Sequence, residues 1–598
     1  MKTKKTLKIG RSDFELIVKN NHYFVDKTIL IYDFYNNEND IILMPRPKRF
    51  GKTLNLSMIE HFFDIQKKES AGLFSEFEIS EKKDFCKEHQ NKYPVINISL
   101  KGIKATDWKS CYDKFKTEIS DLYGKHEYLL KSKKLGELKK ENFTKVLKEK
   151  ASQAKFEYSL KHLSEYLKIH YEKEVIILVD EYDAPIINAF KNTNKPIKSI
   201  DKENKTYYEN VISFMQTFLG EAYKGNEDNL KKGLLTGVMR VGRESIFSEW
   251  NNFDVFGITS TYFSDKFGFT KTETEKILTY FGLQNHLSKI EKWYNGYKFG
   301  NVDKIYNPWS IVSYISKVND GFKPYWVNTG DYSLIKERIT EPNVKDKIQE
   351  LIEGKIIKKH LNENFVFSDF ETDSELIWTL LTYNGYLTQL EKIKYGNYKL
   401  KIPNNEVKIV FTDIIMNWLN TKVKIKRDLL IRTSENLINN EIIEFENGFK
   451  QIVGDTISFY DRAEKTDKET DEIIITHEQI YHVYTLGLLA ILTDDFIIKS
   501  NRESKGGRYD IMLIPHDKTK NGVVIEIKQM EKRKINEKKN NFNKRINNEI
   551  KNALAQIDIN EYYTELIINK IKPENIIKLP IVFAGKEPYI IPLPIDEK

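Results

Sequence analysis

A Gly-Lys-Thr tripeptide, Gly51-Lys52-Thr53, follows the apolar run at residues 41–44 and precedes a helical pattern over residues 54–63. A strand, a loop and a helix in this order can cradle phosphate, because loop N–H groups and the positive end of the helix face the anion. In such a loop the lysine reaches the β- and γ-phosphates and the threonine hydroxyl takes Mg²⁺. The pattern predicts a P-loop in which Arg49, Phe50, Gly51, Lys52 and Thr53 bind a nucleotide.

A second element strengthens this interpretation of the loop. The apolar run at residues 175–179 ends in Asp180 and Glu181, as expected for a buried parallel strand with acids at its carboxyl end. Doubly wound sheets bind their ligands at that edge. We expect Asp180 to hold Mg²⁺ through water and Glu181 to polarise the attacking water. The alternative is a buried strand that runs into an acidic surface turn.

A separate set of charged residues lies near the C-terminus. Asp510 begins a predicted strand, Asn521-Gly522 predicts a hairpin turn, and the return strand carries Glu526 and Lys528 on one face. Pairing across the turn can bring Asp510 near Glu526. Two carboxylates bind Mg²⁺, and a lysine beside them can position water or stabilise negative charge during phosphodiester hydrolysis. The alternative is a surface hairpin, although Glu526 lies within an apolar Val-Val-Ile-Glu-Ile run.

The elements around these residues predict an α/β protein of several domains. Alternating strands and helices predict a P-loop domain with a doubly wound parallel sheet over residues 1–260. Aromatic turns mark a helical, lid-type extension over residues 261–330, and residues 331–460 are mostly helical by periodicity. Residues 461–472 carry many charges and few apolar side chains, which predicts a linker before a compact α/β unit at residues 473–598.

Composition limits the class of protein. Two cysteines, Cys86 and Cys111, are too few for a disulfide framework or a structural zinc site, which fits a reducing compartment. We expect a cytoplasmic protein without a membrane partner, because no run reaches the ~20 apolar residues of a membrane span and the N-terminus lacks a signal peptide's apolar stretch. The net charge of +8 permits nucleic-acid binding without requiring it. The oligomeric state stays open.

The chain resembles proteins that join an AAA-ATPase-like domain to a C-terminal PD-(D/E)XK nuclease-like domain. The likeness covers almost the whole chain and rests on short segments at residues 23–28, 46–54, 178–185, 236–240, 293–297, 306–309, 507–510 and 526–528. In that family the loop is similarly rich in Arg-Pro and lacks the first Gly of the general P-loop pattern. Arg46, which stands at that position, therefore agrees with the family.

The resemblance implies ATP as the nucleotide and Mg²⁺ at both sites. Lys52 and Thr53 would bind ATP with Asp180 and Glu181 as the acidic pair, and Thr53 and Asp180 would hold Mg²⁺. Asp510 and Glu526 would be metal ligands of a restriction-endonuclease-like domain, with Lys528 beside them. It also likens Gln556 and Tyr562 to the accessory Gln and Tyr of some nucleases, at a longer spacing than usual.

Two functions are consistent with these motifs. The first is an ATP-binding and hydrolysing protein that controls a Mg²⁺-dependent nuclease acting on nucleic acid, with DNA preferred over RNA. The second is a nucleotide-switched interaction or defence protein, whose nuclease-like domain binds nucleic acid without cutting it.

Overall fold

The computed structural model describes the chain in segments, which are residues 4–193, 206–240, 253–326, 342–363, 369, 373–464, 487, 491–492, 495–504, 507–534, 536–585 and 587–594. The chain forms two compact units. Unit 1 comprises residues 1–338 and 356–407, and unit 2 comprises residues 339–355 and 408–598. The predicted middle region, residues 331–460, is thus shared between the units. From residue 465 onward the predicted linker lies outside the described residues.

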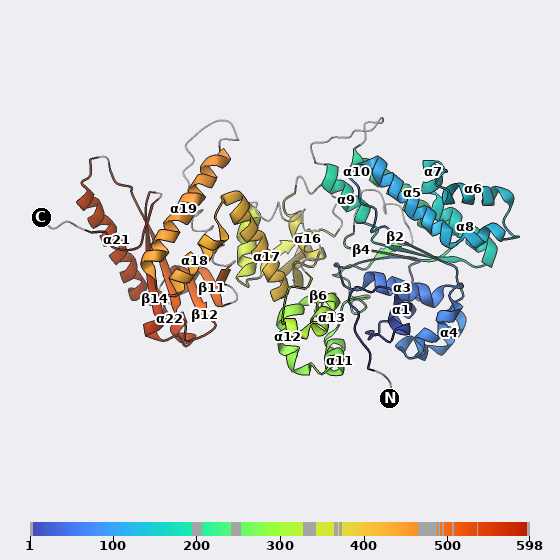
Figure 1. Ribbon diagram of the computed structural model, residues 1–598, viewed down its shortest axis with the longest axis horizontal. Helices are drawn as coiled ribbons and strands as arrows, with labels where there is room; N and C mark the ends of the chain where they lie inside the picture. The colour runs from blue at the N-terminus through green and yellow to red at the C-terminus, as the bar shows by residue number, and fades with distance from the viewer. Residues whose placement is uncertain are drawn as a thin grey trace. The chain divides into compact units, whose positions relative to one another are not determined.

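A five-stranded parallel sheet forms the centre of unit 1 (Figure 1). Its strands, in spatial order, are β2 (Val95–Ser99), β3 (Val175–Asp180), β4 (Leu230–Gly237), β1 (Ile41–Pro45) and β5 (Phe253–Val255). One face carries α1 (Phe14–Lys19), α3 (Lys52–Phe63) and α4 (Lys83–His89), and the other α5 (Trp108–Lys125), α8 (Ser159–Tyr171) and α10 (Tyr207–Tyr223). Because helices cover both faces, β3 is buried along its whole length. The predicted doubly wound parallel sheet is confirmed.

The strand order determines where a ligand can lie. The chain leaves β1 through α3 toward β2 on one side, and leaves β4 for β5 on the opposite side of β1. Connections that diverge in this way open a crevice at the carboxyl ends of the strands. The ends of β1, β4 and β3 are neighbours there, so the predicted loop and the predicted acids meet at one edge.

After the sheet, the chain of unit 1 continues with α11 (Lys271–Phe281), α12 (Leu287–Tyr294) and α13 (Pro308–Ser316), and the hairpin of β6 (Tyr297–Phe299) and β7 (Val302–Ile305) lies between the last two helices. Thr270 and Glu273 form a capping box at the start of α11. The aromatic turns contribute Tyr294 and Tyr306 to a buried cluster with Tyr314. These rings give the helical extension its own apolar core.

A small antiparallel sheet lies within the region that periodicity predicts to be mostly helical. Its strands are β8 (Ile357–His360), β10 (Asn397–Lys401) and β9 (Thr388–Lys392). In β10, buried Tyr398 and Leu400 alternate with more exposed residues, which is the period of a strand. A five-residue alternation is too short to stand out beside the strongly apolar helix α16 (Leu376–Tyr383).

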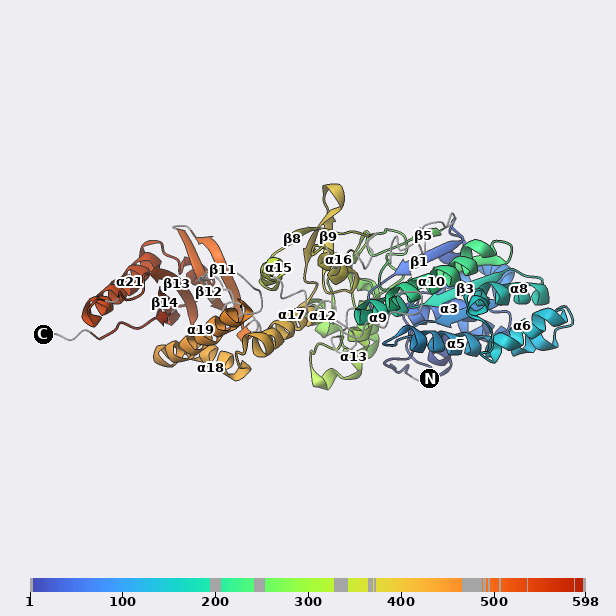
Figure 2. The ribbon, with the colours of Figure 1, turned by 90° about the horizontal axis from the view of Figure 1, so that it is seen from above.

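A mixed five-stranded sheet forms the centre of unit 2. The strands run β11 (Phe496–Ser504), β12 (Gly507–Pro515), β13 (Gly522–Met530), β14 (Ile576–Ala584) and β15 (Glu587–Tyr589), and only the β13–β14 pair is parallel. The helix α21 (Lys539–Ile559) lies on one face, and α18 (Arg427–Ile438) and α19 (Ile442–Glu464) lie on the other (Figure 2).

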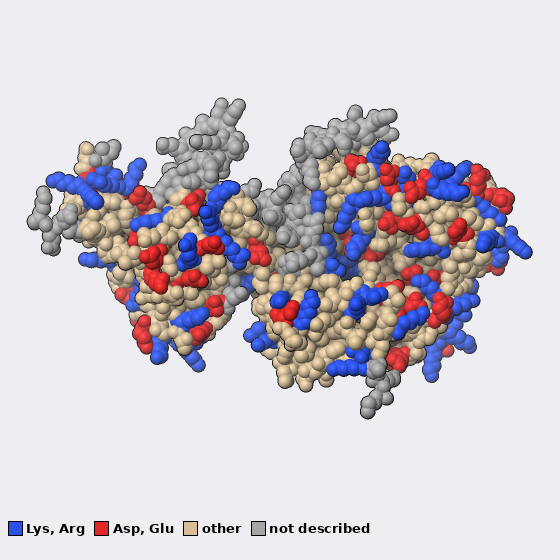
Figure 3. Space-filling model, viewed as in Figure 1, with Lys and Arg blue, Asp and Glu red and all other residues tan. Residues whose placement is uncertain are grey.

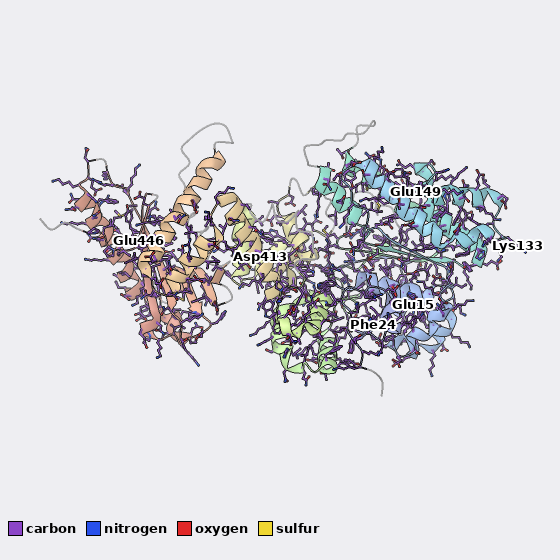
Figure 4. The ribbon with its side chains drawn as sticks, in the orientation of Figure 1. Glu15, Phe24, Lys133, Glu149, Asp413 and Glu446 are labelled. Carbon is purple, nitrogen blue, oxygen red and sulfur yellow. The ribbon has the colours of Figure 1, made fainter. Side chains whose placement is uncertain are left out.

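Neighbouring residues of β14 show how both faces of this sheet are covered. Val582 packs with Ile546 and Ile550 of α21. The adjacent Phe583 has its ring centroid 6.3 Å from that of Phe449 on α19, because successive strand side chains point to opposite faces. Glu446 of α19, labelled in Figure 4, accepts the N–H of Ile590 at 3.0 Å and so holds the chain that follows β15.

In the part of the chain that the structure describes, no helix combines the length and the apolar composition that a bilayer crossing requires.

Arg46 fastens the end of β1 to the segment that follows β5. Its guanidinium is fully buried and donates to the carbonyl oxygens of Pro45 at 2.8 Å, Phe256 at 2.6 Å and Phe263 at 3.0 Å. It also lies 5.1 Å from the ring centroid of Phe267. Burial lowers the pKa of Arg46 to about 9, so the group stays charged at neutral pH. The residue in place of the usual glycine is therefore a structural anchor.

Arg46→Met should lower the free energy of unfolding of unit 1 by roughly 3 kcal/mol, because three buried carbonyl groups lose their donor. Urea unfolding of the full chain, followed by a probe in unit 1, measures the change. The exposed Arg11→Met is the matched control, and equal shifts in the two variants would contradict the anchoring role.

Candidate functional site

The loop after β1 turns sharply at two residues. Arg49 and Gly51 have φ angles of 72° and 91°, in the left-handed region that favours glycine. Gly51 is the N-cap of α3, so Lys52 is the first residue of the helix and Thr53 the second. The loop therefore delivers both predicted side chains to the positive end of the α3 dipole.

Lys52 is buried inside the loop that precedes it. Its ammonium donates to the carbonyl oxygens of Arg46 at 3.0 Å and Pro47 at 3.2 Å. Burial lowers the pKa of this ammonium, and the nearby Glu181 and Asp180 act in the opposite direction. An anion in front of the loop would replace weak carbonyl acceptors with a full negative charge, which suits a phosphate.

Asp180 joins three elements at the carboxyl edge of the sheet. Its side chain is only 2% exposed. One oxygen accepts the hydroxyl of Thr53 at 2.7 Å and the other accepts the hydroxyl of Thr236 at 2.7 Å. The structure therefore brings the predicted Thr53 and Asp180 together. Sequence reasoning did not assign Thr236 to the site, although it lies at the carboxyl end of β4, close to Asp180.

The acids after Asp180 take different positions. Glu181, with a φ of 51°, lines the pocket in front of the loop. Asp183 is buried and accepts the N–H groups of Val238 at 2.8 Å and Met239 at 3.0 Å. Burial raises the pKa of Asp183 to about 6. Asp183 thus supports the turn after β4, a role that sequence reasoning did not identify.

A pocket of about 290 Å³ lies between the loop and the N-terminal segment of the chain. Its lining combines nine basic residues with a single carboxylate, that of Glu181; the basic residues are Lys8, Arg11, Lys27, Lys48, Arg49, Lys52, Lys101, Lys104 and Lys266. Apolar rings complete it, among them Trp309 and Phe24, the latter labelled in Figure 4. Such a lining suits a ligand with several negative charges and an apolar part.

Two of the predicted loop residues also contribute through packing. The Phe50 side chain is 1% exposed and packs against Tyr297, with ring centroids 5.0 Å apart. The Arg49 guanidinium lies 4.1 Å from the ring centroid of Trp309. The Phe50 ring is therefore turned into the protein, while Arg49 stands at the wall of the pocket.

The second predicted site lies in unit 2, on the hairpin of β12 and β13. The antiparallel register pairs Ile511 with Ile525, so Asp510 lies across from Glu526 at the next position. An oxygen of Asp510 accepts the N–H of Ile527 at 2.7 Å. Lys528 donates to one oxygen of Glu526 at 3.0 Å. The structure thus brings all three predicted side chains together.

Glu526 has the properties of a ligand to a cation. Its side chain is 4% exposed, and its second oxygen is buried without a hydrogen-bond partner among the described residues. Burial raises the pKa of Glu526, and the neighbouring Asp510 adds to this, while Lys528 opposes it. A divalent cation would satisfy this oxygen, so the residues fit Mg²⁺. The described residues contain no group of three or more His, Cys, Asp or Glu side chains that could hold a metal, so the chain offers two carboxylates at this site.

A series of hydrogen bonds between side chains holds Lys528 from the side opposite Glu526. Its ammonium donates to the amide oxygen of Gln556 on α21. The Gln556 amide donates to the hydroxyl of Tyr562 at 3.1 Å, and Asn560 donates to the same hydroxyl at 2.9 Å. Of the Gln and Tyr suggested by resemblance, Gln556 therefore contacts Lys528 directly, and Tyr562 is linked to it through Gln556. Asn560 was missed, since nothing in the sequence links it to the site.

A basic stretch follows β13. Lys532, Arg533 and Lys534 are exposed, and Lys538 and Lys539 lie at the start of α21. Figure 3 shows lysine and arginine side chains gathered at this end of unit 2. The strand that carries Glu526 and Lys528 leads directly into this stretch.

Comparison with known proteins identifies two regions of the chain. A family model described as a predicted AAA-ATPase matches residues 8–247, and one of the PD-(D/E)XK nuclease superfamily matches residues 476–592. An uncharacterized protein in the vnfD 5' region of Azotobacter chroococcum mcd 1 is 26% identical over 423 residues, which are 69% of this chain and 70% of that protein. The structure of the Walker-type ATPase PABY2304 of Pyrococcus abyssi is 13% identical, covers 67% of this chain and 98% of its own, and has a TM-score of 0.36.

The two matched regions include both sites described above. The first contains the loop, Asp180 and Thr236, and the second contains Asp510, Glu526 and Lys528. The domain architecture expected from the sequence motifs is confirmed. The chain therefore contains a region that matches the predicted AAA-ATPase model and a region that matches the PD-(D/E)XK nuclease superfamily.

Proposed function

We propose that unit 1 binds and hydrolyses ATP and that unit 2 cleaves phosphodiester bonds of nucleic acid, with DNA preferred. The observation that carries the first part is the buried Lys52 beside Thr53 and Asp180 at the carboxyl edge of the sheet. The basic pocket in front of this edge supports a triphosphate ligand. The pair of Asp510 and Glu526 beside Lys528 supports the second part.

In the ATPase site, each residue has a distinct task. Lys52 moves its hydrogen bonds from the loop carbonyls to the β- and γ-phosphates, and Glu181 accepts the proton of the attacking water. Thr53 and, through water, Asp180 would hold Mg²⁺. When bound, this ion supplies positive charge that offsets the charge of the phosphates.

In the nuclease site, Asp510 and Glu526 would hold Mg²⁺, which supplies a Lewis acid for the scissile phosphate. Lys528 orients the attacking water or stabilises the negative charge that develops on phosphate oxygens. Gln556 and Tyr562 keep the Lys528 ammonium in place. The basic stretch after β13 contacts phosphates next to the scissile bond.

A specific observation favours the second candidate function, a nucleotide-switched protein that binds nucleic acid without cutting it. In the described residues only two carboxylates meet at the unit 2 site, and Lys528 already pairs with Glu526. A third ligand from the chain would be needed to hold the metal as firmly as in many hydrolases. Cleavage assays on DNA and RNA, with Mg²⁺ or EDTA and with or without ATP, distinguish the two candidates.

Lys52→Ala should weaken ATP binding at least tenfold, because the charge that meets the β- and γ-phosphates is lost. Calorimetric titration with Mg-ATP gives the affinity, and thermal unfolding checks the fold. Lys83→Ala, at an exposed lysine outside the pocket, serves as control. Wild-type affinity and turnover in Lys52→Ala would rule out a phosphate role for this loop.

Glu181→Gln should still bind ATP but hydrolyse it on the order of a hundredfold more slowly, because the amide cannot accept the water proton. Binding and single-turnover hydrolysis are measured on the same preparation. Asp183→Asn is the informative comparison, since Asp183 supports the turn after β4 and its loss should lower stability. Loss of ATP binding in Glu181→Gln would show that the roles are wrongly assigned.

Asp510→Ala and Glu526→Ala should each abolish metal-dependent cleavage, because each removes half of the charge that holds the cation. Lys528→Ala should slow cleavage with a smaller loss of metal affinity, since an ammonium is not a ligand. The double variant Asp510→Ala/Glu526→Ala should be no worse than either single variant. ATP hydrolysis in all of them provides the internal control, and cleavage that survives EDTA or Glu526→Ala would refute the assignment.

A further inference from the structure

Glu406 is a fully buried carboxylate in unit 1, in the first turn of α17 (Asn405–Trp418). One of its oxygens accepts the backbone N–H of Trp326 at 2.7 Å, and the other accepts the hydroxyl of Ser310 at 2.7 Å. Burial raises the pKa of Glu406 to about 7, and the bonds from Trp326 and Ser310 oppose the shift. Burying a carboxyl group costs free energy of folding unless hydrogen-bond donors compensate it. The positions of the two donors are therefore informative about the role of Glu406.

Both donors lead to the nucleotide loop. The indole N–H of Trp326 donates to the carbonyl oxygen of Lys48 at 3.2 Å. Ser310 adjoins Trp309, whose ring lies 4.1 Å from the Arg49 guanidinium. Glu406 is therefore linked by two separate routes to Lys48 and Arg49, consecutive residues of the loop.

The two aromatic turns, at residues 293–297 and 306–309, have no role in the proposed chemistry. They position Ser310 and the chain that leads into α17. Asn307 caps α13 by accepting the N–H of Trp309 at 2.9 Å, which fixes the helix turn that carries Ser310. In the turn at residues 293–297, the carbonyl of Asn295 accepts the side-chain amide of Asn404 at 2.6 Å. Gly296 has a φ of 99°, and a Cβ there would lie 2.0 Å from the carbonyl oxygen of Pro403. Only glycine lets the chain before α17 approach so closely.

The helix α17 begins in unit 1 and continues into unit 2. Residues from Lys408 onward belong to unit 2, while Asn405 and Glu406 belong to unit 1. A helix is a stiff element, so a displacement of its first turn moves the rest of it.

We propose that Glu406 is a positioning residue that sets the conformation of the nucleotide loop and couples it to the start of α17. The coupling rests on the proposed function, because ATP is the ligand that would move the loop. Glu406 makes no contact with the reacting groups in this proposal. It acts through Trp326 on Lys48 and through Ser310 and Trp309 on Arg49.

The first test needs no nucleotide. Hydrogen exchange is measured in peptides that cover residues 46–55 and Gly268, whose N–H donates to the carbonyl of Phe50 at 3.2 Å. In the full chain, Glu406→Gln removes one of two acceptors, and Trp326→Phe removes the indole donor while it keeps the backbone bond to Glu406. Each should raise exchange of these peptides about fivefold.

Glu391→Gln is the matched control, because Glu391 lies in the same unit on β9 and pairs with Lys399 on the surface. It should leave exchange unchanged. If Trp326→Phe folds normally and leaves loop exchange at the wild-type value, the positioning role is wrong. Thermal unfolding separates a local effect from a general loss of stability.

The second test uses Mg-ATP and a double-mutant cycle. Each single variant should weaken ATP affinity about fivefold, and the double variant should be no weaker than the worse single one, because both act on Lys48. In the wild type, ATP should change the exchange of residues 408–418, and Glu406→Gln should remove that response. Additive losses, or a response of α17 that persists in Glu406→Gln, would overturn the coupling.

The two tests also separate this inference from the proposed function. A wild-type chain that binds no ATP would refute the proposed function and the coupling to α17. Hydrogen exchange of the loop peptides, measured without nucleotide, would still decide whether Glu406 positions the loop.

Discussion

The hydrogen bonds of Asp180 hold together the part of the molecule on which the proposed ATPase site depends. A carboxylate that is 2% exposed is stable only if donors surround it, and here the hydroxyls of Thr53 and Thr236 each approach to 2.7 Å. These bonds join the start of α3 to the ends of β3 and β4. They set the distance between the loop and the acidic strand, and therefore where the proposed triphosphate ligand would lie.

Other buried charges in unit 1 follow the same physical rule. Arg46 and Asp183 are satisfied by backbone groups, and Glu406 by one backbone N–H and one hydroxyl, all at ends of strands or helices or in the segments between them. A backbone donor or acceptor at such a place has no partner in a helix or sheet, so a buried side chain can satisfy it. The framework around the loop is thus held by charged groups with fixed partners. Such bonds are directional, which suits a site whose geometry must be accurate.

Unit 2 positions its charged residues by a different constraint. The register of β12 and β13 places Asp510 across from Glu526, and alternation along β13 puts Lys528 on the same face as Glu526. A slip of one residue would turn Glu526 and Lys528 to the opposite face. Val524 and Ile525 are both buried and point to opposite faces, so such a slip would disrupt the packing of the strand on both faces of the sheet. The pairing of Lys528 with Glu526 keeps a buried carboxylate compensated when no cation is bound.

The sequence by itself determined those features that depend on local patterns. The strands at residues 41–45, 95–99 and 175–180, the hairpin after Asn521 and the capping box at Thr270 each have a periodicity or a turn signal within a short window. The predicted site residues follow from the same windows, since Asp180 ends its strand, the loop follows the strand at residues 41–45, and Asp510, Glu526 and Lys528 lie within the two strands of the hairpin. Family resemblance then supplied the nature of the expected ligands.

Only the tertiary structure decided the partners that come from distant parts of the chain. Thr236 meets Asp180 because β4 is inserted between β1 and β3, and no local pattern encodes that strand order. The burial of Arg46 against carbonyls more than 200 residues away, and the bonds of Glu406 to Ser310 and Trp326, are equally non-local. Contacts of this kind arise from the packing of whole elements, so a single sequence specifies them only through the complete fold.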